Sequence, residues 1–346
     1  MKIAQIAPLA EPVPPDRYGG TERVVGLLTD ELVRRGHEVT LFASGDSGTD
    51  AQLVAATPRS LRRDPAAIDP LAPHIRELGM VFDRADAFDI IHSHVDDLAF
   101  PAARLSATPT IHTLHGRLDL RAQREVFSEF RDLPLVSISD AQREPLRDLG
   151  LNWVGTIHHG LQVKDYPFAA TAGRYLAFCG RISPEKRPDL AIEVAHRVGL
   201  PLKLAAKIAD ADREYFERDI RALLDRPGIE FLGEIDEPAK LDMLAGALAL
   251  LFPIDWPEPF GLVMIEAMAT GTPVVTRPFG ATREVVAHGK TGFIADTVDD
   301  LAAAVRRVET LDRMACRRHV EQRFSVARMA DDYVRLYGRL TDSAAA

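Results

Sequence analysis

The segment Glu258–Ala269, with the sequence EPFGLVMIEAMA, combines two glutamates with an apolar run that has helical character. Glu266 is the only charged residue between Phe260 and Ala269, and burying a lone carboxylate is costly unless it is hydrogen-bonded. Two neighbouring hydroxyls of a ligand, such as those of a ribose, would satisfy both of its oxygens. A lysine or arginine from elsewhere in the chain would also satisfy it, and the spacing leaves both possibilities open.

The residues between these glutamates predict the beginning of a helix. The N–H groups of a first helical turn lack intrahelical acceptors and suit a phosphate. The residues of this turn are Phe260, Gly261, Leu262 and Val263. Gly261 allows a ligand to approach the backbone closely, and helical side chains tilt toward the N-terminus, so Glu266 is expected to point back toward the phosphate. Glu258 precedes the helix in a Pro-rich loop, where it either projects over the helix start or lies on the surface.

A basic loop, Gly180–Pro188 (GRISPEKRP), follows an apolar strand candidate directly. Arg181 and Lys186 are suited to neutralise a diphosphate leaving group, the arginine as a bidentate fork and the lysine as a point charge. Gly180, at the end of the strand, is assigned to the same site. Loop cations are more often merely solvated, and Arg187 is expected to cap a helix or to face solvent.

Histidines follow several strand candidates in the first half of the chain. The three pairs are His92 and His94, His112 and His115, and His158 and His159. We expect His112 and His115 to share one face of their strand and all three pairs to line one cleft. A neutral histidine can exchange a hydrogen bond with a sugar hydroxyl or a phosphate. His115, next to Gly116, is the preferred catalytic candidate, although structural core histidines are commoner.

Two further motifs concern phosphate and metal binding. Gly19 and Gly20 open a helix after the first strand, where paired glycines suit contact with a phosphate or a sugar. The chain has neither the Gly-x-Gly-x-x-Gly fingerprint nor a P-loop, which disfavours a nicotinamide or flavin enzyme and excludes a P-loop ATPase. Asp210-Ala211-Asp212 is similar to the Asp-x-Asp of metal-dependent transferases, but it precedes a charged helix and is interpreted as an N-cap. No metal site is predicted.

Short apolar strands alternate with amphipathic helices along the whole chain, which predicts α/β domains with doubly wound, Rossmann-like parallel sheets. With 346 residues, two domains are expected, spanning 1–163 and 164–325, and a final helix at 326–341 is expected to pack back on the first domain. Thr49–Leu71 is interpreted as a loop. Because ligands bind at the carboxyl ends of parallel strands, we expect the two domains to face each other across the cleft that holds the site.

Composition narrows the class of protein. The formal net charge is −9, with acidic and basic residues interspersed, so there is no electrostatic reason to expect nucleic acid as a partner. Cys179 and Cys316 are the only cysteines and are predicted to be reduced thiols. The sequence MKIAQIAP is predicted to form a first core strand rather than a signal peptide, and no apolar stretch approaches the roughly 20 residues that cross a bilayer. The expected location is cytoplasmic.

Taken together, the motifs resemble glycosyltransferase family four, retaining enzymes of the GT-B fold that use a nucleotide-sugar donor. The frame from Glu258 to Glu266 and on to Val275 is similar to the family signature, and Gly180-Arg181 with Lys186 is similar to its diphosphate site. The other matching motifs are Gly19-Gly20-x-Glu22, Thr113-x-His115 and Gly289-Lys290-Thr291-Gly292. The resemblance spans about residues 1–340, with the motifs in the family's order.

The resemblance implies a role for each candidate residue. Glu266 would hold the ribose hydroxyls and Glu258 those of the donor sugar. Arg181 and Lys186 would stabilise the departing diphosphate with the help of the helix amides. Gly19 and Gly20 would let their loop close over the donor, and His115 would contact the transferred sugar. A hexosyl group would thus pass from a UDP- or GDP-sugar to an acceptor hydroxyl with retention, and neither a dedicated metal nor another cofactor is expected.

Several questions stay open at this stage. A nucleotide-sugar epimerase of the same fold, or an inactive sugar-nucleotide-binding protein, are the alternatives. The acceptor is a small molecule, a glycan or a lipid-linked molecule, and the arginines of Arg59–Arg63 give only weak support for contact with a membrane surface. Asp255 and Trp256 depart from the family pattern and are expected to shape the sugar pocket. The sequence does not specify the base and sugar of the donor, the linkage or the oligomeric state.

Overall fold

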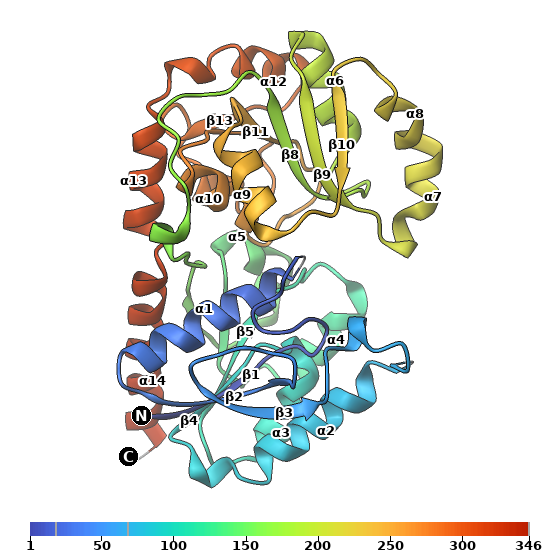
Figure 1. The fold of residues 1–346 in the computed structure, drawn as a ribbon. Helices are drawn as coiled ribbons and strands as arrows, with labels where there is room; N and C mark the ends of the chain where they lie inside the picture. Colours follow the sequence, from blue (N-terminus) through green and yellow to red (C-terminus); the bar gives the residue numbers. More distant parts are fainter. Residues whose placement is uncertain (18, 68, 345–346) are drawn as a thin grey trace. The chain divides into compact units, whose positions relative to one another are not determined.

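The computed structural model describes residues 1–17, 19–67 and 69–344, with the side chains of 343 and 344 excepted. The chain forms two compact units (Figure 1). The N-terminal unit contains Met1–Gly160 together with the chain from Val326 onward, and the C-terminal unit contains Leu161–Ser325. The sequence-based boundary at residue 163 falls in the 3₁₀ turn Val163–Asp165.

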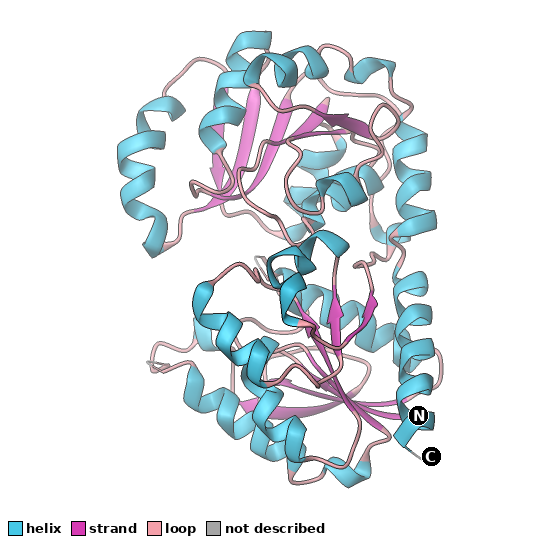
Figure 2. Cartoon of the chain, turned by 180° about the vertical axis from the view of Figure 1, so that it is seen from behind, coloured by secondary structure: helices cyan, strands magenta, loops and turns pink. Residues whose placement is uncertain are grey.

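The N-terminal unit is built on a seven-stranded parallel sheet with the order β3-β2-β1-β4-β5-β6-β7. The strands are β1 (Lys2–Ile6), β2 (Glu38–Ser44), β3 (Gln52–Thr57), β4 (Ile90–Ser93), β5 (Thr110–Leu114), β6 (Leu135–Ser137) and β7 (Trp153–Thr156). The helices are α1 (Gly20–Arg34), α2 (Leu71–Phe82), α3 (Phe100–Leu105), α4 (Arg121–Glu129), α5 (Asp140–Arg143) and α14 (Val326–Ala344). Helices cover both faces of the sheet (Figure 2).

The strands of this sheet lie in the interior of the unit and carry many apolar residues. Ile3 of β1 pairs in register with Val39 of β2 and with Ile90 of β4. Strand β5 is buried along its whole length, as expected for a parallel sheet that is covered on both faces. Helix α14 packs beside α1, and its Tyr333 and Tyr337 are almost fully buried. The last helix therefore belongs to the N-terminal unit.

The C-terminal unit repeats the same plan with a six-stranded parallel sheet in the order β10-β9-β8-β11-β12-β13. The strands are β8 (Leu176–Arg181), β9 (Leu202–Lys207), β10 (Ile229–Gly233), β11 (Ala249–Phe252), β12 (Val274–Thr276) and β13 (Gly292–Ile294). The helices are α6 (Pro188–Val198), α7 (Arg213–Tyr215), α8 (Arg221–Leu224), α9 (Glu237–Ala245), α10 (Leu262–Ala269), α11 (Thr282–Val285), α12 (Val298–Val305) and α13 (Arg313–Arg323). A π-helical segment, Phe216–Ile220, joins α7 to α8.

In both sheets the strand order reverses beside the first strand, at β1/β4 and at β8/β11. This is the Rossmann order, and ligands of such sheets bind beyond the carboxyl ends of the strands where the order reverses. The fold class expected from the sequence, two doubly wound α/β units, is confirmed. A ligand is therefore expected to bind at the loops that follow β8 and β11 in one unit, and β1 and β4 in the other.

One expectation about the first half is wrong. Thr49–Leu71 was interpreted as a loop, but Gln52–Thr57 within it form strand β3 at the edge of the sheet. Leu53–Ala56 in β3 are apolar, but only Ala56 is fully buried, as expected for a strand at the edge of a sheet.

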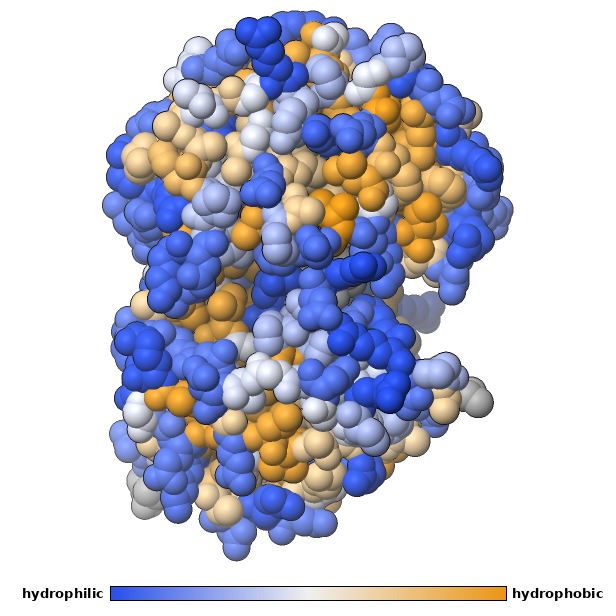
Figure 3. All heavy atoms as spheres, in the orientation of Figure 1, coloured by the Kyte–Doolittle hydropathy of each residue, from blue (hydrophilic) through white to orange (hydrophobic). Residues whose placement is uncertain are grey.

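Figure 3 shows polar residues over most of the visible surface, with smaller apolar areas between them. Among the residues that the structure describes, no helix has both the length and the apolar composition needed to span a bilayer.

Candidate functional site

Lys186 and Glu258, which are 72 residues apart in the sequence, form an ion pair through the Nζ and Oε2 atoms. Lys186 lies in the loop after β8, and Glu258 lies in the loop between β11 and α10. Trp256 donates its Nε1–H to the same Oε2 atom at 2.9 Å, and its ring lies 5.1 Å from Nζ of Lys186. The structure thus brings two of the predicted site residues together, and Trp256 holds the carboxylate from another side.

The backbone of Glu258 is held by a glycine from another segment. Ala281 donates its N–H to the carbonyl oxygen of Glu258 at 2.9 Å. Gly280 has a φ of +55°, and a Cβ atom at this position would lie only 2.2 Å from that oxygen. Gly280 is therefore required both for its left-handed backbone and for its close approach to the Glu258 loop.

Glu266 is 4% exposed, and its Oε1 accepts a hydrogen bond from Nζ of Lys240 at 2.8 Å. Lys240 also pairs with Glu237 one turn earlier on α9, at 2.8 Å. Lys240 is thus the cation that the sequence left unidentified as a partner for this carboxylate. The spacing of 26 residues carries no signal for such a pair, because α9 and α10 meet only in the folded unit.

Helix α10 begins at Leu262, and Gly261 occupies its N-cap position with a φ of +83°. This left-handed backbone conformation favours glycine, because side chains with a Cβ atom rarely adopt it. The amides of the first turn, Val263 included, carry the positive end of the helix dipole. Phe260 is only 2% exposed, and its ring packs edge-on against Phe324 in the core of the unit.

Arg181, the last residue of β8, pairs with the carboxylates of Asp212 and Glu185, each at 3.2 Å. The expectation that the Asp210–Asp212 motif supplies an N-cap is met in position only. Asp212 occupies the N-cap position of α7 without a side-chain capping hydrogen bond. Its carboxylate instead orients the Arg181 guanidinium. The neighbouring Gly180 is open, because a Cβ atom there would meet nothing within 4 Å.

Arg187 and Asp255 take part in ion pairs that connect the loop after β8 with the loop after β11. Arg187 adopts a φ of +53° and pairs with Asp189 at 2.7 Å and with Asp255 at 2.9 Å. Asp255 also pairs with Arg277 at 2.9 Å. Arg187 occupies the N-cap position of α6, as one of its two expected roles had it, and its side chain makes ion pairs. Asp255 joins two loops through two arginines.

In the N-terminal unit, helix α1 begins at Gly20, and Gly19 precedes it with a φ of +148°. A Cβ atom on Gly19 would lie 2.9 Å from the Pro15 side chain, so this tight turn favours glycine. Glu22, in the first turn of α1, is buried, and this burial raises the pKa of its carboxyl group.

The histidines after β4 and β5 form a connected cluster in the N-terminal unit. Nδ1 of His94 lies 2.9 Å from Nε2 of His115, and Nε2 of His94 lies 2.8 Å from Oε1 of Gln5. The ring of His159 stacks on that of His115, with 5.2 Å between centroids. Burial lowers the pKa of His115 to about 3 and keeps that of His94 well below 6.5, so both rings are neutral at pH 7.

His112 is separate from this cluster. Its ring packs edge-on against Phe100, with 4.8 Å between centroids, and burial lowers its pKa to about 3. The expectation that His112 and His115 share one face is wrong. Successive side chains of a strand point to opposite faces, so residues three apart lie on opposite sides.

Asp96 is a polar residue near His115 that the sequence did not single out. Its Oδ1 accepts a hydrogen bond from the backbone N–H of His115 at 3.1 Å, and its φ of +46° is unusual for a non-glycine residue. Burial raises the pKa of its carboxyl group to about 6. A strained backbone together with a shifted pKa is typical of functional sites.

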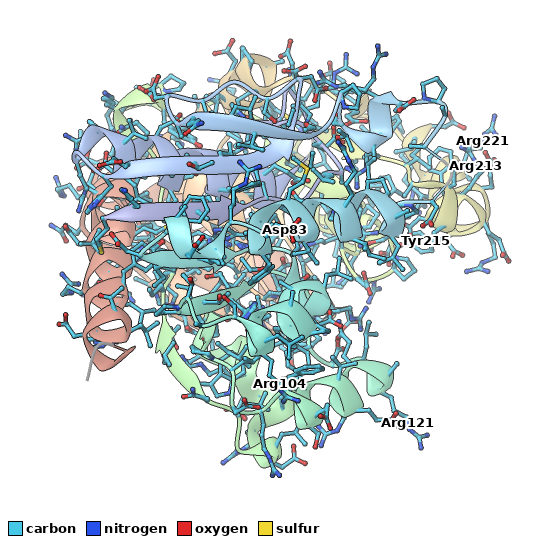
Figure 4. The ribbon with its side chains drawn as sticks, turned by 90° about the horizontal axis from the view of Figure 1, so that it is seen from below. Asp83, Arg104, Arg121, Arg213, Tyr215 and Arg221 are labelled. Atoms are coloured by element: carbon cyan, nitrogen blue, oxygen red, sulfur yellow. The ribbon has the colours of Figure 1, made fainter. Side chains whose placement is uncertain are left out.

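Charge on the outer surface is locally balanced. Arg213 and Arg221 project from the outer side of α7 and α8 (Figure 4). Arg213 pairs with Asp210 at 2.8 Å and Arg221 with Glu217 at 2.6 Å. These helices therefore do not present an unbalanced basic surface. Within the described part of the chain, no group of three or more His, Cys, Asp or Glu side chains is arranged to hold a metal ion.

Comparisons with known proteins agree with this geometry. Residues 18–165 match the model described as Glycosyltransferase Family 4, and residues 167–323 match Glycosyl transferases group 1. Glycogen synthase of Mycobacterium tuberculosis strain H37Rv is 29% identical over 356 residues, covering 85% of this chain and 83% of the relative.

Solved structures agree as well. AviGT4, a glycosyltransferase involved in avilamycin A biosynthesis, is 26% identical with a TM-score of 0.75, and the match covers 99% of this chain and 98% of that one. Anabaena Alr3699/HepE in complex with UDP-glucose is 18% identical with a TM-score of 0.74, over 98% of this chain and 100% of that one; this likeness concerns the fold. With both halves matched in order, the chain is an enzyme of the GT-B fold that belongs to glycosyltransferase family four.

Proposed function

We propose that this glycosyltransferase moves a hexosyl group from a UDP- or GDP-sugar to an acceptor hydroxyl with retention of configuration and without a dedicated metal. The observation that carries the proposal is the Lys186–Glu258 ion pair beside the first turn of α10. A cation, a carboxylate and a helix N-terminus are the groups needed to bind a diphosphate on one side and sugar hydroxyls on the other.

The cations of this site would act on the leaving group. In the transfer, the bond between the sugar C1 and the diphosphate oxygen breaks, and a bond between C1 and the acceptor oxygen forms on the same face. Charge develops on the diphosphate, where Lys186 and Arg181 would stabilise it together with the α10 amides. Asp212 and Glu185 hold Arg181 in place before the donor arrives. The departing diphosphate oxygen would accept the proton of the acceptor hydroxyl.

The carboxylates would position the donor. Glu258 would accept hydrogen bonds from sugar hydroxyls, and Glu266 would do so from the ribose hydroxyls. Lys240 already occupies Oε1 of Glu266, which leaves the Oε2 atom as the expected ribose contact. His115 would contact the transferred sugar, and Gly19 and Gly20 would contact the donor phosphates through their backbone. Neither glutamate is the nucleophile in this scheme.

Lys186→Met and Glu258→Gln test the proposal. The controls are Lys290→Met and Glu309→Gln, which change exposed residues of the same unit. Thermal unfolding with UDP-glucose, GDP-mannose and ADP-glucose would identify the donor, because a ligand that binds the folded state raises its stability. We expect donor turnover to fall at least about a hundredfold in the site variants, since one electrostatic contact in a transition state is worth about 3 kcal/mol.

Unchanged turnover in both site variants would overturn the proposal. Product formed from the donor alone, as an isomerised nucleotide sugar, would instead identify an epimerase. Turnover that depends on adding a divalent metal after treatment with a chelator would contradict the metal-free scheme. The acceptor, whether a small molecule, a glycan or a lipid-linked molecule, is to be found by a second panel with the donor fixed. The free thiols of Cys179 and Cys316 support the cytoplasm as the compartment.

A further inference from the structure

We propose that Gln5 and His94 are positioning residues that hold His115 in one tautomer, with Nε2 protonated and Nδ1 offering its lone pair to a sugar hydroxyl. The inference rests on the proposed function, in which His115 touches the transferred sugar. It adds Gln5 on β1 and His94 after β4, which decide what kind of hydrogen bond His115 makes.

The three side chains form a continuous hydrogen-bonded row across neighbouring strands. Gln5 is on β1, His94 follows β4 and His115 follows β5, and these strands are adjacent in the sheet. The Gln5 oxygen lies 2.8 Å from Nε2 of His94, and Nδ1 of His94 lies 2.9 Å from Nε2 of His115. Gln5 is fully buried and His94 is 2% exposed, so water does not compete for these contacts.

The direction of each hydrogen bond follows from the first acceptor. The Gln5 carbonyl oxygen can only accept, so Nε2 of His94 carries the proton. His94 is neutral, and its Nδ1 is therefore a bare acceptor that requires a proton on Nε2 of His115. Because His115 is neutral as well, its own Nδ1 has a lone pair and no proton. The orientation of the Gln5 amide thus determines whether Nδ1 of His115 carries a proton.

A second row of hydrogen bonds starts from the amide nitrogen of Gln5. The Gln5 Nε2 donates to the Tyr337 hydroxyl at 3.3 Å, and this hydroxyl lies 2.7 Å from Nδ1 of His92. Nε2 of His92 lies 2.7 Å from Oγ1 of Thr113. A flipped Gln5 would require every proton in both rows to move to the other partner. Tyr337 on α14 is therefore part of the hydrogen-bonded network that reaches His115, which follows β5.

Nδ1 of His115, at the end of the row, is available to bind a ligand. Nδ1 of His115 has no hydrogen-bond partner among the described residues, and a buried polar atom without a partner costs about 1–3 kcal/mol. Besides His94, the ring of His159 stacks on that of His115, and the Asp96 carboxylate binds the backbone N–H of His115. A lone pair at Nδ1 can accept a hydrogen bond from a sugar hydroxyl but cannot give a proton to the leaving oxygen.

The tautomer can be observed directly by NMR. In protein labelled with ¹⁵N at its 11 histidines, long-range ¹H–¹⁵N correlations distinguish Nδ1–H, Nε2–H and doubly protonated rings. Signals are assigned with single substitutions. We expect His94 and His115 as Nε2–H tautomers, unchanged from pH 6 to pH 8. A His115 ring with its proton on Nδ1, or one that becomes doubly protonated in this range, would overturn the proposal.

Two variants test the direction of control. Gln5→Met keeps the approximate volume but removes both polar atoms, and Tyr337→Phe removes one hydroxyl from the second row. Each is expected to give a measurable fraction of the Nδ1–H tautomer at His115 in protein that still unfolds cooperatively. For Gln5→Met we expect kcat with UDP-glucose, or with the donor found in the panel, to fall about tenfold, the value of one hydrogen bond of about 1.4 kcal/mol, with the KM of the donor changed much less.

His112→Leu is the matched control, because His112 is a fully buried, neutral histidine that lies outside both rows. It should leave the tautomer of His115 and kcat unchanged. If Gln5→Met leaves the tautomer of His115 unaltered, the positioning role is wrong even when His115→Ala abolishes turnover. If Gln5→Met changes the tautomer of His115 but His115→Ala retains full turnover, the positioning role of Gln5 is supported. The role proposed for His115 in the reaction is then wrong.

Discussion

Nζ of Lys240 lies 2.8 Å from Oε1 of Glu266, and the two side chains are 14% and 5% exposed. The carboxylate assigned to the ribose is therefore half of a largely buried ion pair before any donor binds. Two carboxylates, Glu237 and Glu266, share the one ammonium group, so Lys240 fixes the end of α9 against α10. Loss of the Lys240–Glu266 pair should therefore affect both donor binding and the stability of the C-terminal unit.

Lys240→Met is expected to destabilise the protein by about 3 kcal/mol, because removing one partner of a buried pair leaves an uncompensated charge. Urea unfolding measures this loss. The double variant Lys240→Met/Glu266→Gln should regain part of it, since the buried charge is then removed as well. We also expect Lys240→Met to raise the Kd of the donor, because Glu266 loses the contact that orients it.

Lys203→Met is the control for this prediction. Lys203 pairs with Glu230 at 3.5 Å, with side chains that are 34% and 56% exposed. A pair so exposed to solvent contributes about 0–1 kcal/mol. Equal losses of stability in the two lysine variants would show that burial of the Glu266 pair has no energetic consequence.

The sequence predicted the parts of this site that follow from local order. Residues after β8 and before α10 could be placed together because parallel strands bring their carboxyl ends to one edge of the sheet. Lys186 and Glu258 lie there and are in contact. The alternation of strands and helices was equally readable, because short segments rich in apolar residues alternate with amphipathic helices along the chain.

The remaining contacts depend on tertiary packing, which no local pattern encodes. Asp212 and Lys240 lie on charged segments whose spacing is that of ordinary surface helices, and only the fold shows that they turn toward Arg181 and Glu266. The row from Gln5 to His115 crosses three strands that are far apart in the sequence. The pairing of His112 with His115 on one face was an error in applying the two-residue period of a strand.

Gly280→Ala is expected to lower activity far more than Gly289→Ala. Both glycines have a positive φ, of +55° and +74°, so the backbone strain from a side chain is of the same kind. A Cβ atom on Gly280 would lie 2.2 Å from the carbonyl oxygen of Glu258, whereas one on Gly289 would meet nothing within 4 Å. The first substitution must therefore displace the Glu258 loop.

Comparing the activities of the two variants distinguishes displacement of the Glu258 loop from backbone strain at the substituted glycine. We expect Gly280→Ala to reduce kcat/KM for the donor by at least about tenfold, corresponding to 1.4 kcal/mol, while Gly289→Ala loses only stability. The comparison uses donor turnover and thermal unfolding on both proteins. If the two variants lose activity equally, the contact between Gly280 and Glu258 does not position the carboxylate.

Asp96→Asn is expected to stabilise the protein at pH 7.5. Burial raises the pKa of Asp96 from 3.8 to about 6, so the folded state holds this proton more tightly than the unfolded state does. Stability from this group is therefore complete below pH 3.8 and is lost as the pH rises through about 6. A shift of about two pKa units corresponds to at most about 3 kcal/mol, and partial exposure of the side chain reduces the expected effect to about 1–2 kcal/mol.

Asparagine keeps an oxygen that can accept the hydrogen bond from the backbone N–H of His115, so the local geometry should survive the substitution. Urea unfolding of both proteins between pH 4 and pH 8 measures the effect. The wild-type protein should lose stability relative to Asp96→Asn as the pH rises from about 4 to about 6, with a constant difference above that range. A difference that is independent of pH would show that the Asp96 carboxyl is not the group that titrates.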